Sequence, residues 1–442
     1  RSSSTEEEPT MNTKTTVKQA IFMVFVSIIL WGVVMEIAVR YFVSNSVLEQ
    51  LDSLRGMSKL RPSVPFILNT KNAKNQHTTT EFDVEYKINS FGFRDDYIQK
   101  NKVPGQKRII FIGPSWVFGW GVERRHAVPE VVERHIRMHF PQDKIEVINA
   151  GVPSQWILQN VIYYIFMLHE FQPDFIVHMQ AEDITFQIAA DMGRMLGERK
   201  EILSPDGKFQ KIYQELTGVP IVGKLHLVYF ILETLRNSSF GRNLVNTLIP
   251  TRNKTGEIEG TLKNYIDSNA YDPIFSLTLT KILALYERLG VKGLDEINES
   301  LLLGGDPISE KFLNTGEFPP EKLDLKTVGQ GSQILREFEI ALSKSGIGYL
   351  FCNFGGHPYL EDDGARKKAY IMRVSESALD RAQVSAIHFN QFLFQEKGYQ
   401  WGSSNVKKLF HPKDRHPNKS GYKELADFIW RELLKLNKLG AG

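Results

Sequence analysis

Three polar side chains, far apart in the sequence, are of the types that nucleophilic acyl chemistry requires. Ser115 follows the apolar run RIIFIG in the segment GPSWVFGWGV, and Asp414 and His416 lie close together in HPKDRHPNKSGY near the end of the chain. A serine attacks an acyl carbon when a histidine takes its proton and a carboxylate orients that histidine. Gly-Pro-Ser alone is also ordinary turn chemistry before a helix. The downstream Asp and His therefore favour the chemical interpretation.

Strand and helix patterns alternate around Ser115. Strands are expected where short apolar runs occur, and helices where apolar residues recur at helical spacing. The expected order is strand 108–113, helix 127–140, strand 144–151, helix 154–171 and strand 173–183. This alternation predicts a parallel sheet covered by helices. It places Ser115 just past the carboxyl end of the first core strand, where open α/β sheets build their sites.

The same alternation resumes near the end of the chain, after a less regular stretch. We expect a helix around 331–345, a strand over 347–354 and a closing helix over 420–438, with Ser420 as its N-cap. Residues 188–334 contain loop-rich segments between apolar helical pieces, without a fixed repeat period, so a solenoid is not expected. We interpret them as a largely helical insertion, which forms a lid or docks on another membrane protein.

Composition and charge limit the classes of protein to consider. The 442 residues are 42% hydrophobic and 24% charged, as expected of a folded chain. A net charge of +3, from 54 basic and 51 acidic residues, gives no field that would indicate a nucleic-acid partner. Cys352 is the only cysteine, so an intrachain disulfide and a cysteine-built metal site are excluded.

An apolar segment near the start of the chain predicts a membrane anchor. The run AIFMVFVSIILWGVVMEIAV is long enough to span a bilayer, and we place the anchor at 19–43. The alternatives are a buried core helix, disfavoured by polar flanks, and a cleaved signal peptide, disfavoured by the length of the run. Residues 1–10 are interpreted as a cloning remnant before Met11, and 11–18 as a short tail. Flanking basic residues do not set the orientation.

Two further segments of the N-terminal part carry expectations of their own. Glu36 lies near the far end of the apolar run, where it either reaches the membrane interface or pairs with a partner subunit inside the membrane. Residues 44–105 are polar and irregular, with short alternation and a turn signal in DVEYKINSFGFRDDY. We interpret them as a stalk and lead-in to the α/β domain, which is expected over 106–187 and 335–440.

Four blocks of sequence make the chain resemble the SGNH (GDSL-type) esterase and acyltransferase family, in its bacterial membrane-anchored form. The blocks are NSFGFRDD, FIGPSWVFGWGV, VINAGV and DRHPNKSGY, and the resemblance covers 83–187 and 335–440. It implies a three-layer SGNH-hydrolase-like α/β domain in which Ser115 is the nucleophile, His416 the base and Asp414 the residue that orients it. It also implies that the backbone N–H groups of Ser115 and Gly151 face the oxyanion.

The chain departs from the family pattern at three positions. Pro114 replaces the acidic residue before the serine, and Asp414 stands two residues before His416, where three is the commoner spacing. Asp183 falls on the position of an asparagine whose amide donates to the oxyanion. An ionised carboxylate has no proton to donate, so Asp183 must be protonated, turned away or incompatible with efficient catalysis. Loss of one such donor typically costs roughly 10²–10³ in rate.

Other residues that suggest chemistry have simpler interpretations. His178 and His357 lie near strand ends without partners at metal-ligand spacing, so we expect structural roles and no metal site. Phe118 and Trp120 are expected in the core rather than on a sugar-stacking surface. The run GPSWVFGWG does not match the phosphate-binding loop, which leaves nucleotide binding unsupported. No cofactor is expected.

The resemblance implies an extracytoplasmic acyl-ester hydrolase or O-acyltransferase, anchored in the cell inner membrane by one helix, with its C-terminal domain in the periplasm. Its substrate would be a cell-envelope carbohydrate or lipid, attacked through a Ser-His-Asp triad. The alternative is a catalytically inactive SGNH-like domain that serves as a binding or scaffold subunit of a membrane protein complex. Asp183 and Pro114 favour this alternative, whereas Ser115, Asp414 and His416 favour the enzyme.

Overall fold

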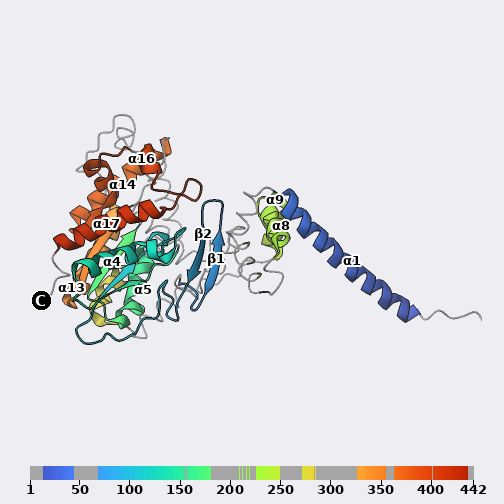
Figure 1. Ribbon diagram of the computed structural model, residues 1–442, viewed down its shortest axis with the longest axis horizontal. Helices are drawn as coiled ribbons and strands as arrows, with labels where there is room; N and C mark the ends of the chain where they lie inside the picture. Colours follow the sequence, from blue (N-terminus) through green and yellow to red (C-terminus); the bar gives the residue numbers. More distant parts are fainter. Residues whose placement is uncertain are drawn as a thin grey trace, which may run out of the picture.

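The computed structural model shows an α/β domain, with a hairpin at one side, and an N-terminal helix that extends away from it (Figure 1). The structure describes residues 13–43, 68–153, 155, 157–180, 209, 212, 216, 219, 225–248, 271–282, 284, 326–354, 363–400 and 402–436. Asp183 and His357 lie outside these residues, as does much of the predicted insertion.

A parallel sheet of five strands forms the centre of the domain, which confirms the predicted fold class. In the order β4-β3-β5-β6-β7, the strands are Ile145–Asn149, Lys107–Ile112, Phe175–Gln180, Gly348–Asn353 and Ala386–His388. β3 lies between β4 and β5, so that Ile110 pairs with Ile148 on one side and with Ile176 on the other. β3 is thus a central strand, buried on both faces, as its unbroken apolar run predicted.

Helices cover both faces of the sheet and make three layers (Figure 1). On one face, α5 (Ile157–Phe166), α13 (Lys326–Lys344) and the end of α14 (Asp363–Arg381) pack against the even-numbered residues of β3. On the other face, α4 (Val128–His139) and α17 (Lys419–Lys435) pack against its odd-numbered residues. The period of two along a strand assigns neighbouring side chains to opposite cores.

Several short elements complete the domain and connect its layers. They are α3 (Ser115–Phe118), η1 (Arg124–His126), η2 (Leu168–Phe171), η4 (Pro273–Phe275), α15 (Phe389–Gln391), η6 (Phe392–Glu396) and α16 (Ser404–Lys407). Within the predicted insertion, Phe275, Leu279 and Ile282 join the core beside α5 and α13. This part of the insertion is therefore packed on the sheet domain.

An antiparallel hairpin lies beside the sheet, within the predicted stalk and lead-in. Its strands are β1 (Lys74–Thr78) and β2 (Asp83–Lys87). Val84 and Tyr86 of β2 pack with Phe118 and Trp120, which come from the segment that follows β3. Both aromatic residues are buried, in agreement with their predicted place in the core. The hairpin thus covers the loop that carries Ser115.

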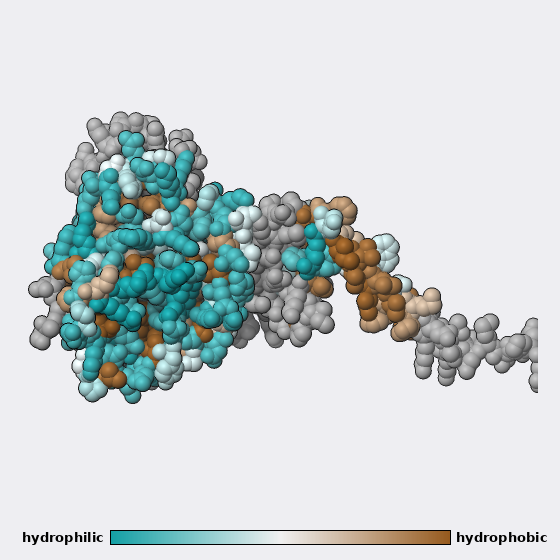
Figure 2. Space-filling view, viewed as in Figure 1, coloured by the Kyte–Doolittle hydropathy of each residue, from teal (hydrophilic) through white to brown (hydrophobic). Residues whose placement is uncertain are grey.

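The N-terminal helix α1 (Thr13–Phe42) has the length and composition of a membrane span. Its segment Ile21–Phe42 has a mean hydropathy of 2.5, and large apolar side chains such as Phe22 and Trp31 are exposed. Figure 2 shows this apolar surface standing free of the domain. Helices in the core of a protein bury such side chains, so α1 is not a core helix of the described structure. A signal sequence near the N-terminus shares these properties.

Glu36 of α1 finds its partners within the chain. Its carboxylate accepts hydrogen bonds from the backbone N–H groups of His226 (3.1 Å) and Leu227 (2.7 Å) and from Arg40 Nε (2.7 Å). His226 begins α8 (His226–Arg236), which is followed by α9 (Ser239–Leu248). A carboxylate that accepts from the free N–H groups at a helix start stabilises that helix. Glu36 therefore ties α8 to the end of α1.

Candidate active site

A tight turn delivers Ser115 from the end of β3 to the first position of α3. Gly113 has a φ of 151°, and a Cβ there would lie 2.4 Å from the carbonyl oxygen of Met179. Only glycine fits this close approach between neighbouring strands. The Pro114 carbonyl accepts from the N–H groups of Val117 (3.0 Å) and Phe118 (3.1 Å). Proline is compatible with this position because the first helical hydrogen bonds use its carbonyl as acceptor. No helical hydrogen bond here requires the backbone N–H that proline lacks.

One buried arginine, Arg94, stabilises the turn after α3 by hydrogen bonds to its carbonyl groups. Gly119 (φ 84°) and Gly121 (φ 77°) adopt left-handed conformations that favour glycine. The Arg94 guanidinium donates to the carbonyls of Phe118 (2.8 Å), Gly119 and Val122 (2.7 Å). Arg94 is 1% exposed, and burial lowers its pKa. The arginine of the NSFGFRDD block thus fixes the backbone of the nucleophile turn.

The structure brings Ser115, His416 and Asp414 together in one chain of hydrogen bonds. His416 Nε2 lies 2.8 Å from Ser115 Oγ, and His416 Nδ1 lies 2.7 Å from Asp414 Oδ1. Both distances are those of direct hydrogen bonds. With Nδ1–H donated to the carboxylate, Nε2 is the ring atom available to accept the serine proton. These three side chains have the arrangement of an activated serine nucleophile.

A left-handed bend at Arg415 allows the Asp414 carboxylate to reach the His416 ring although only one residue separates them. Arg415 has a φ of 71°, and its N–H donates to the carbonyl of His411 at 2.9 Å, while His411 N–H donates back to the His416 carbonyl at 2.8 Å. Asp414 Oδ1 accepts both from His416 Nδ1 and from the His416 backbone N–H, the latter at 3.3 Å. A left-handed residue is costly for a side chain other than glycine and is common at functional sites.

The Asp414 carboxylate has one further hydrogen-bond partner besides His416. Trp120 Nε1 donates to Asp414 Oδ2 at 3.2 Å, which links the nucleophile turn to the acid loop. Burial of Asp414 opposes its ionisation, but the hydrogen bonds from His416 and Trp120 outweigh it and lower the pKa of Asp414 below its usual value. Asp414 is thus an ionised acceptor, as the orienting position requires.

The hairpin holds the acid loop from outside the sheet. Glu81, in the turn between β1 and β2, accepts from the backbone N–H groups of Lys413 (2.9 Å) and Asp414 (2.7 Å). Lys413 Nζ also donates to Thr80 Oγ1 at 3.0 Å. On the other side, the Tyr86 hydroxyl accepts from Gly121 N–H at 2.8 Å. The hairpin therefore contacts both loops of the candidate triad.

Replacing Glu81 with glutamine is expected to slow any reaction at Ser115 about tenfold, because a charged acceptor of two backbone bonds becomes a neutral acceptor of one. The fall should appear in kcat for an acyl ester, with little change in KM, since Glu81 acts through Asp414. Glu85→Gln, at a half-buried residue of the same hairpin that pairs with the exposed Lys74 and Lys87, is the matched control and should leave kcat unchanged. A wild-type kcat in a folded Glu81→Gln variant would show that the hairpin does not position the acid loop.

Gly151, the other predicted oxyanion donor, lies against the nucleophile helix. A Cβ at Gly151 would lie 2.3 Å from the backbone nitrogen of Phe118, so only glycine fits. Its N–H points to Asn149 Oδ1 at 3.2 Å. The Ser115 N–H, at the first position of α3, has no acceptor within the helix. Of the two predicted backbone donors, one is thus engaged by an intramolecular acceptor in this structure.

An acidic cluster lies behind Asn149. The Asn149 amide donates to both carboxylate oxygens of Glu130 at 3.4 Å, and its backbone N–H donates to Asp95 Oδ2 at 3.2 Å. Asp95 also accepts from Arg124 Nη1 at 2.5 Å. Burial next to Asp95 raises the pKa of Glu130 to about 8, and burial raises the pKa of Asp95 to about 6. The residue Glu130 keeps some exposed surface, but its carboxyl group is enclosed.

These raised pKa values predict that the domain loses stability as the pH rises. A free glutamate ionises near 4.5, whereas folded Glu130 holds its proton to about 8. Between these values the folded state binds more protons than the unfolded state, so the free energy of unfolding falls with increasing pH. Glu130→Gln should flatten this fall, which urea unfolding at about pH 5 and about pH 8 would measure. An equally steep fall in the variant would contradict the assignment.

His178, which the sequence analysis considered as a metal ligand, lies in the packed core of the domain. His178 is buried in β5, where its Nδ1 lies 3.0 Å from the Tyr349 hydroxyl, and burial lowers its pKa to about 3. Among the described residues, no group of three or more His, Cys, Asp and Glu side chains is arranged to hold a metal ion. Tyr422 of α17 donates to the carbonyls of Ser115 (3.4 Å) and Trp120 (3.1 Å), a contact that the sequence pattern did not reveal.

No family model matches the chain, and no curated protein is significantly similar to it. What the structure defines is an α/β domain with a five-strand parallel sheet and an N-terminal apolar helix. At the carboxyl edge of that sheet it joins a serine, a histidine and an aspartate by hydrogen bonds.

Proposed function

We propose that this chain is a membrane-anchored acyl-ester hydrolase or O-acyltransferase of SGNH type, which uses Ser115, His416 and Asp414 as its triad. The observation that carries the proposal is the pair of hydrogen bonds from Ser115 Oγ through the His416 ring to Asp414, at 2.8 and 2.7 Å. A serine placed at a strand end, with its base already oriented, matches the general geometry of activated nucleophiles.

The contacts between the sequence blocks support the SGNH resemblance. Arg94 of the first block holds the carbonyls of the nucleophile turn, and Gly151 of the third packs against the α3 backbone. Asp414 and His416 of the last block reach Ser115. These blocks are far apart in sequence and meet at one site, as the parts of one catalytic constellation would.

The reaction follows from the available donors and acceptors. His416 Nε2 takes the proton of Ser115 Oγ as the oxygen attacks the acyl carbon, and the carbonyl π bond opens to an oxyanion. The tetrahedral intermediate collapses, the ester C–O bond breaks and His416 gives its proton to the leaving alcohol. An acyl-Ser115 remains. Water or a sugar hydroxyl then attacks the acyl carbon while His416 takes its proton. The bond between the acyl carbon and Ser115 Oγ breaks and His416 returns the proton to Oγ, which releases an acid or an acylated sugar.

The oxyanion is where this site differs most from an efficient enzyme. The Ser115 N–H is one donor, and the Gly151 N–H becomes a second when the oxyanion displaces Asn149 Oδ1 from it. A negatively charged oxygen is a stronger acceptor than a neutral amide oxygen, so this exchange is favourable. The identity of Asp183 at the third donor position predicts a slow enzyme rather than a fast one.

The membrane part of the proposal rests on α1. Its exposed apolar segment Ile21–Phe42 is long enough to cross a bilayer once. We place α1 in the cell inner membrane and the α/β domain in the periplasm, where a cell-envelope carbohydrate or lipid is the substrate. The bond between Glu36 and the start of α8 keeps part of the insertion at the end of the anchor, available to a membrane protein partner.

A second candidate function is a catalytically inactive scaffold subunit. The observation in its favour is the Gly151 N–H, which already has an acceptor in Asn149, together with an aspartate at position 183. Under this proposal, the SGNH-like domain binds a partner of a membrane complex, and the triad is a remnant. It predicts that Ser115 has no unusual reactivity.

Turnover of a simple ester separates the two candidates. The full chain in detergent micelles is incubated with p-nitrophenyl acetate, beside Ser115→Ala and beside Ser276→Ala as a serine control outside the triad. We expect hydrolysis that Ser115→Ala removes and Ser276→Ala retains. Equal rates in all three proteins, at the level of the buffer, would support the scaffold.

A further inference from the structure

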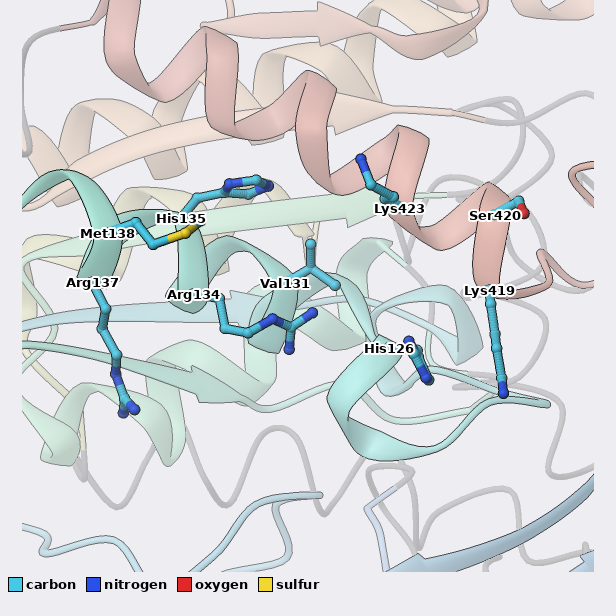
Figure 3. A pocket seen from close by; sticks show the side chains of 9 residues that line it. All are labelled: His126, Val131, Arg134, His135, Arg137, Met138, Lys419, Ser420 and Lys423. Carbon is cyan, nitrogen blue, oxygen red and sulfur yellow. The ribbon is translucent and has the colours of Figure 1, made fainter.

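A basic groove runs along the outer surface of the domain between α4 and α17 (Figure 3). It has a volume of about 640 Å³. Its cationic and titratable side chains come from η1, α4 and α17 and are His126, Arg134, His135, Arg137, Lys419 and Lys423. Val131 and Met138 add apolar surface between them, and Met138 is 65% exposed. The groove therefore combines an apolar lining with positive charge.

Carboxylates among the described residues neutralise only part of this positive charge. Arg137 pairs with Glu133, and Lys423 pairs with Asp427, which also contacts His135. Arg134 donates to a backbone carbonyl, that of Arg125, at 2.7 Å.

The positive charges of two groove residues, Arg134 and Lys419, are therefore not neutralised by a neighbouring carboxylate. Arg134 has no carboxylate partner, and the Lys419 ammonium makes no hydrogen bond or ion pair, within the part of the chain that the structure describes. Burial and the neighbouring charge of Lys419 both lower the pKa of His126, which indicates a positive field at this end of the groove.

The groove and the triad share one helix. Lys419 is the first residue of α17 and stands three residues after His416. On the inner side of the same helix, Tyr422 donates to the Ser115 carbonyl at 3.4 Å. A ligand held along the groove at Lys419 therefore lies beside the loop that carries the base.

We propose that this groove binds a strand of an acidic glycan, with carboxylates at Arg134 and Lys419 and sugar-ring faces on the apolar lining. The inference rests on the proposed function, because it places a polymeric substrate next to Ser115. A lipid surface fits less well, since α4 and α17 lie beyond the hairpin from α1 (Figure 1). The described lining offers no aromatic face other than imidazole for stacking nucleobases, which single-stranded nucleic acids prefer.

Binding of a uronic-acid oligosaccharide tests this inference. The full chain carries Ser115→Ala to prevent turnover, and calorimetry compares hexagalacturonate with neutral maltohexaose. The variant Arg134→Gln with Lys419→Gln is compared with Lys74→Gln and Lys87→Gln, which removes two exposed hairpin cations instead. We expect hexagalacturonate to bind, the groove variant to weaken binding roughly tenfold or more, and the hairpin variant to change it little. Higher salt should weaken binding as well.

Three results would overturn the inference. The first is equal affinity in the groove variant and the parent, and the second is equal affinity for the neutral and the acidic hexasaccharide. The third is binding of poly-glutamate but not of hexagalacturonate, which would assign the groove to an acidic polypeptide. Each of these outcomes can be distinguished from a failure of the proposed function, because the reaction of Ser115 with a small ester does not require the groove. Esterase activity without glycan binding would reject the glycan-binding inference and leave the proposed function of Ser115 in place.

Discussion

Asp414→Asn is expected to lower kcat for an acyl ester about 10³–10⁴-fold while the protein stays folded. In the structure, Asp414 Oδ1 accepts from His416 Nδ1 at 2.7 Å, so that Nε2 faces Ser115. An asparagine that presents its NH₂ group to the ring favours the opposite tautomer, with the proton on Nε2. His416 could then no longer accept the proton of the serine.

Steady-state kinetics of the purified variant measure this effect. The control is Asp380→Asn, whose side chain is 69% exposed on α14 and pairs with His388 outside the triad, and it should keep the wild-type rate. Far-UV circular dichroism establishes that both variants are folded. A kcat for Asp414→Asn within a few-fold of wild type would show that Asp414 does not orient the base.

Arg94→Met is expected to destabilise the domain by at least about 3 kcal/mol, since buried acceptors that lose their donor each cost roughly 1–3 kcal/mol. Arg94 donates to the carbonyls of Phe118, Gly119 and Val122, and its guanidinium lies over the Tyr86 and Phe118 rings. The methionine fills similar volume but leaves the Phe118 and Val122 carbonyls without the Arg94 donor, and the Gly119 carbonyl with only the long bond from the Val122 N–H at 3.4 Å. Because they form the nucleophile turn, the reaction of Ser115 should slow as well.

Urea unfolding gives the change in the free energy of unfolding. Arg137→Met, at a side chain that is 69% exposed, is the control and should change it by less than about 0.5 kcal/mol. Arg94→Lys should rescue little, because an ammonium cannot reproduce the planar fork. Full stability of Arg94→Met would contradict the role assigned to the NSFGFRDD block.

The strands that the sequence predicted are those with mainly apolar runs. β3, β4, β5 and β6 are buried on both faces, so their residues need no alternation and stand out as short apolar segments. β7 was not predicted, because it has only three residues, all partly exposed. The closing helix was predicted with Ser420 as its N-cap, but the cap is Asn418, whose Oδ1 accepts from the N–H groups of Ser420 and Gly421.

The candidate site could be predicted only in its innermost part. Ser115, Asp414 and His416 are recognisable by residue type and by their place beside a strand and a helix. The contacts of Glu81 with the acid loop, and of Trp120 with Asp414, join residues that are hundreds of positions apart. Hydrophobic periodicity contains no information about such pairings. Asn149 was likewise missed, because its role depends on where the Gly151 N–H points.

The central claim is that Ser115 is an activated nucleophile, and its reaction with a fluorophosphonate probe tests this claim most directly. The full chain in detergent micelles is treated with the probe, and the modified residue is identified by mass spectrometry of its peptides. We predict modification at Ser115, which is lost in Ser115→Ala and strongly slowed in Asp414→Asn. Absence of Ser115 modification in folded protein would contradict the enzymatic account and leave the scaffold.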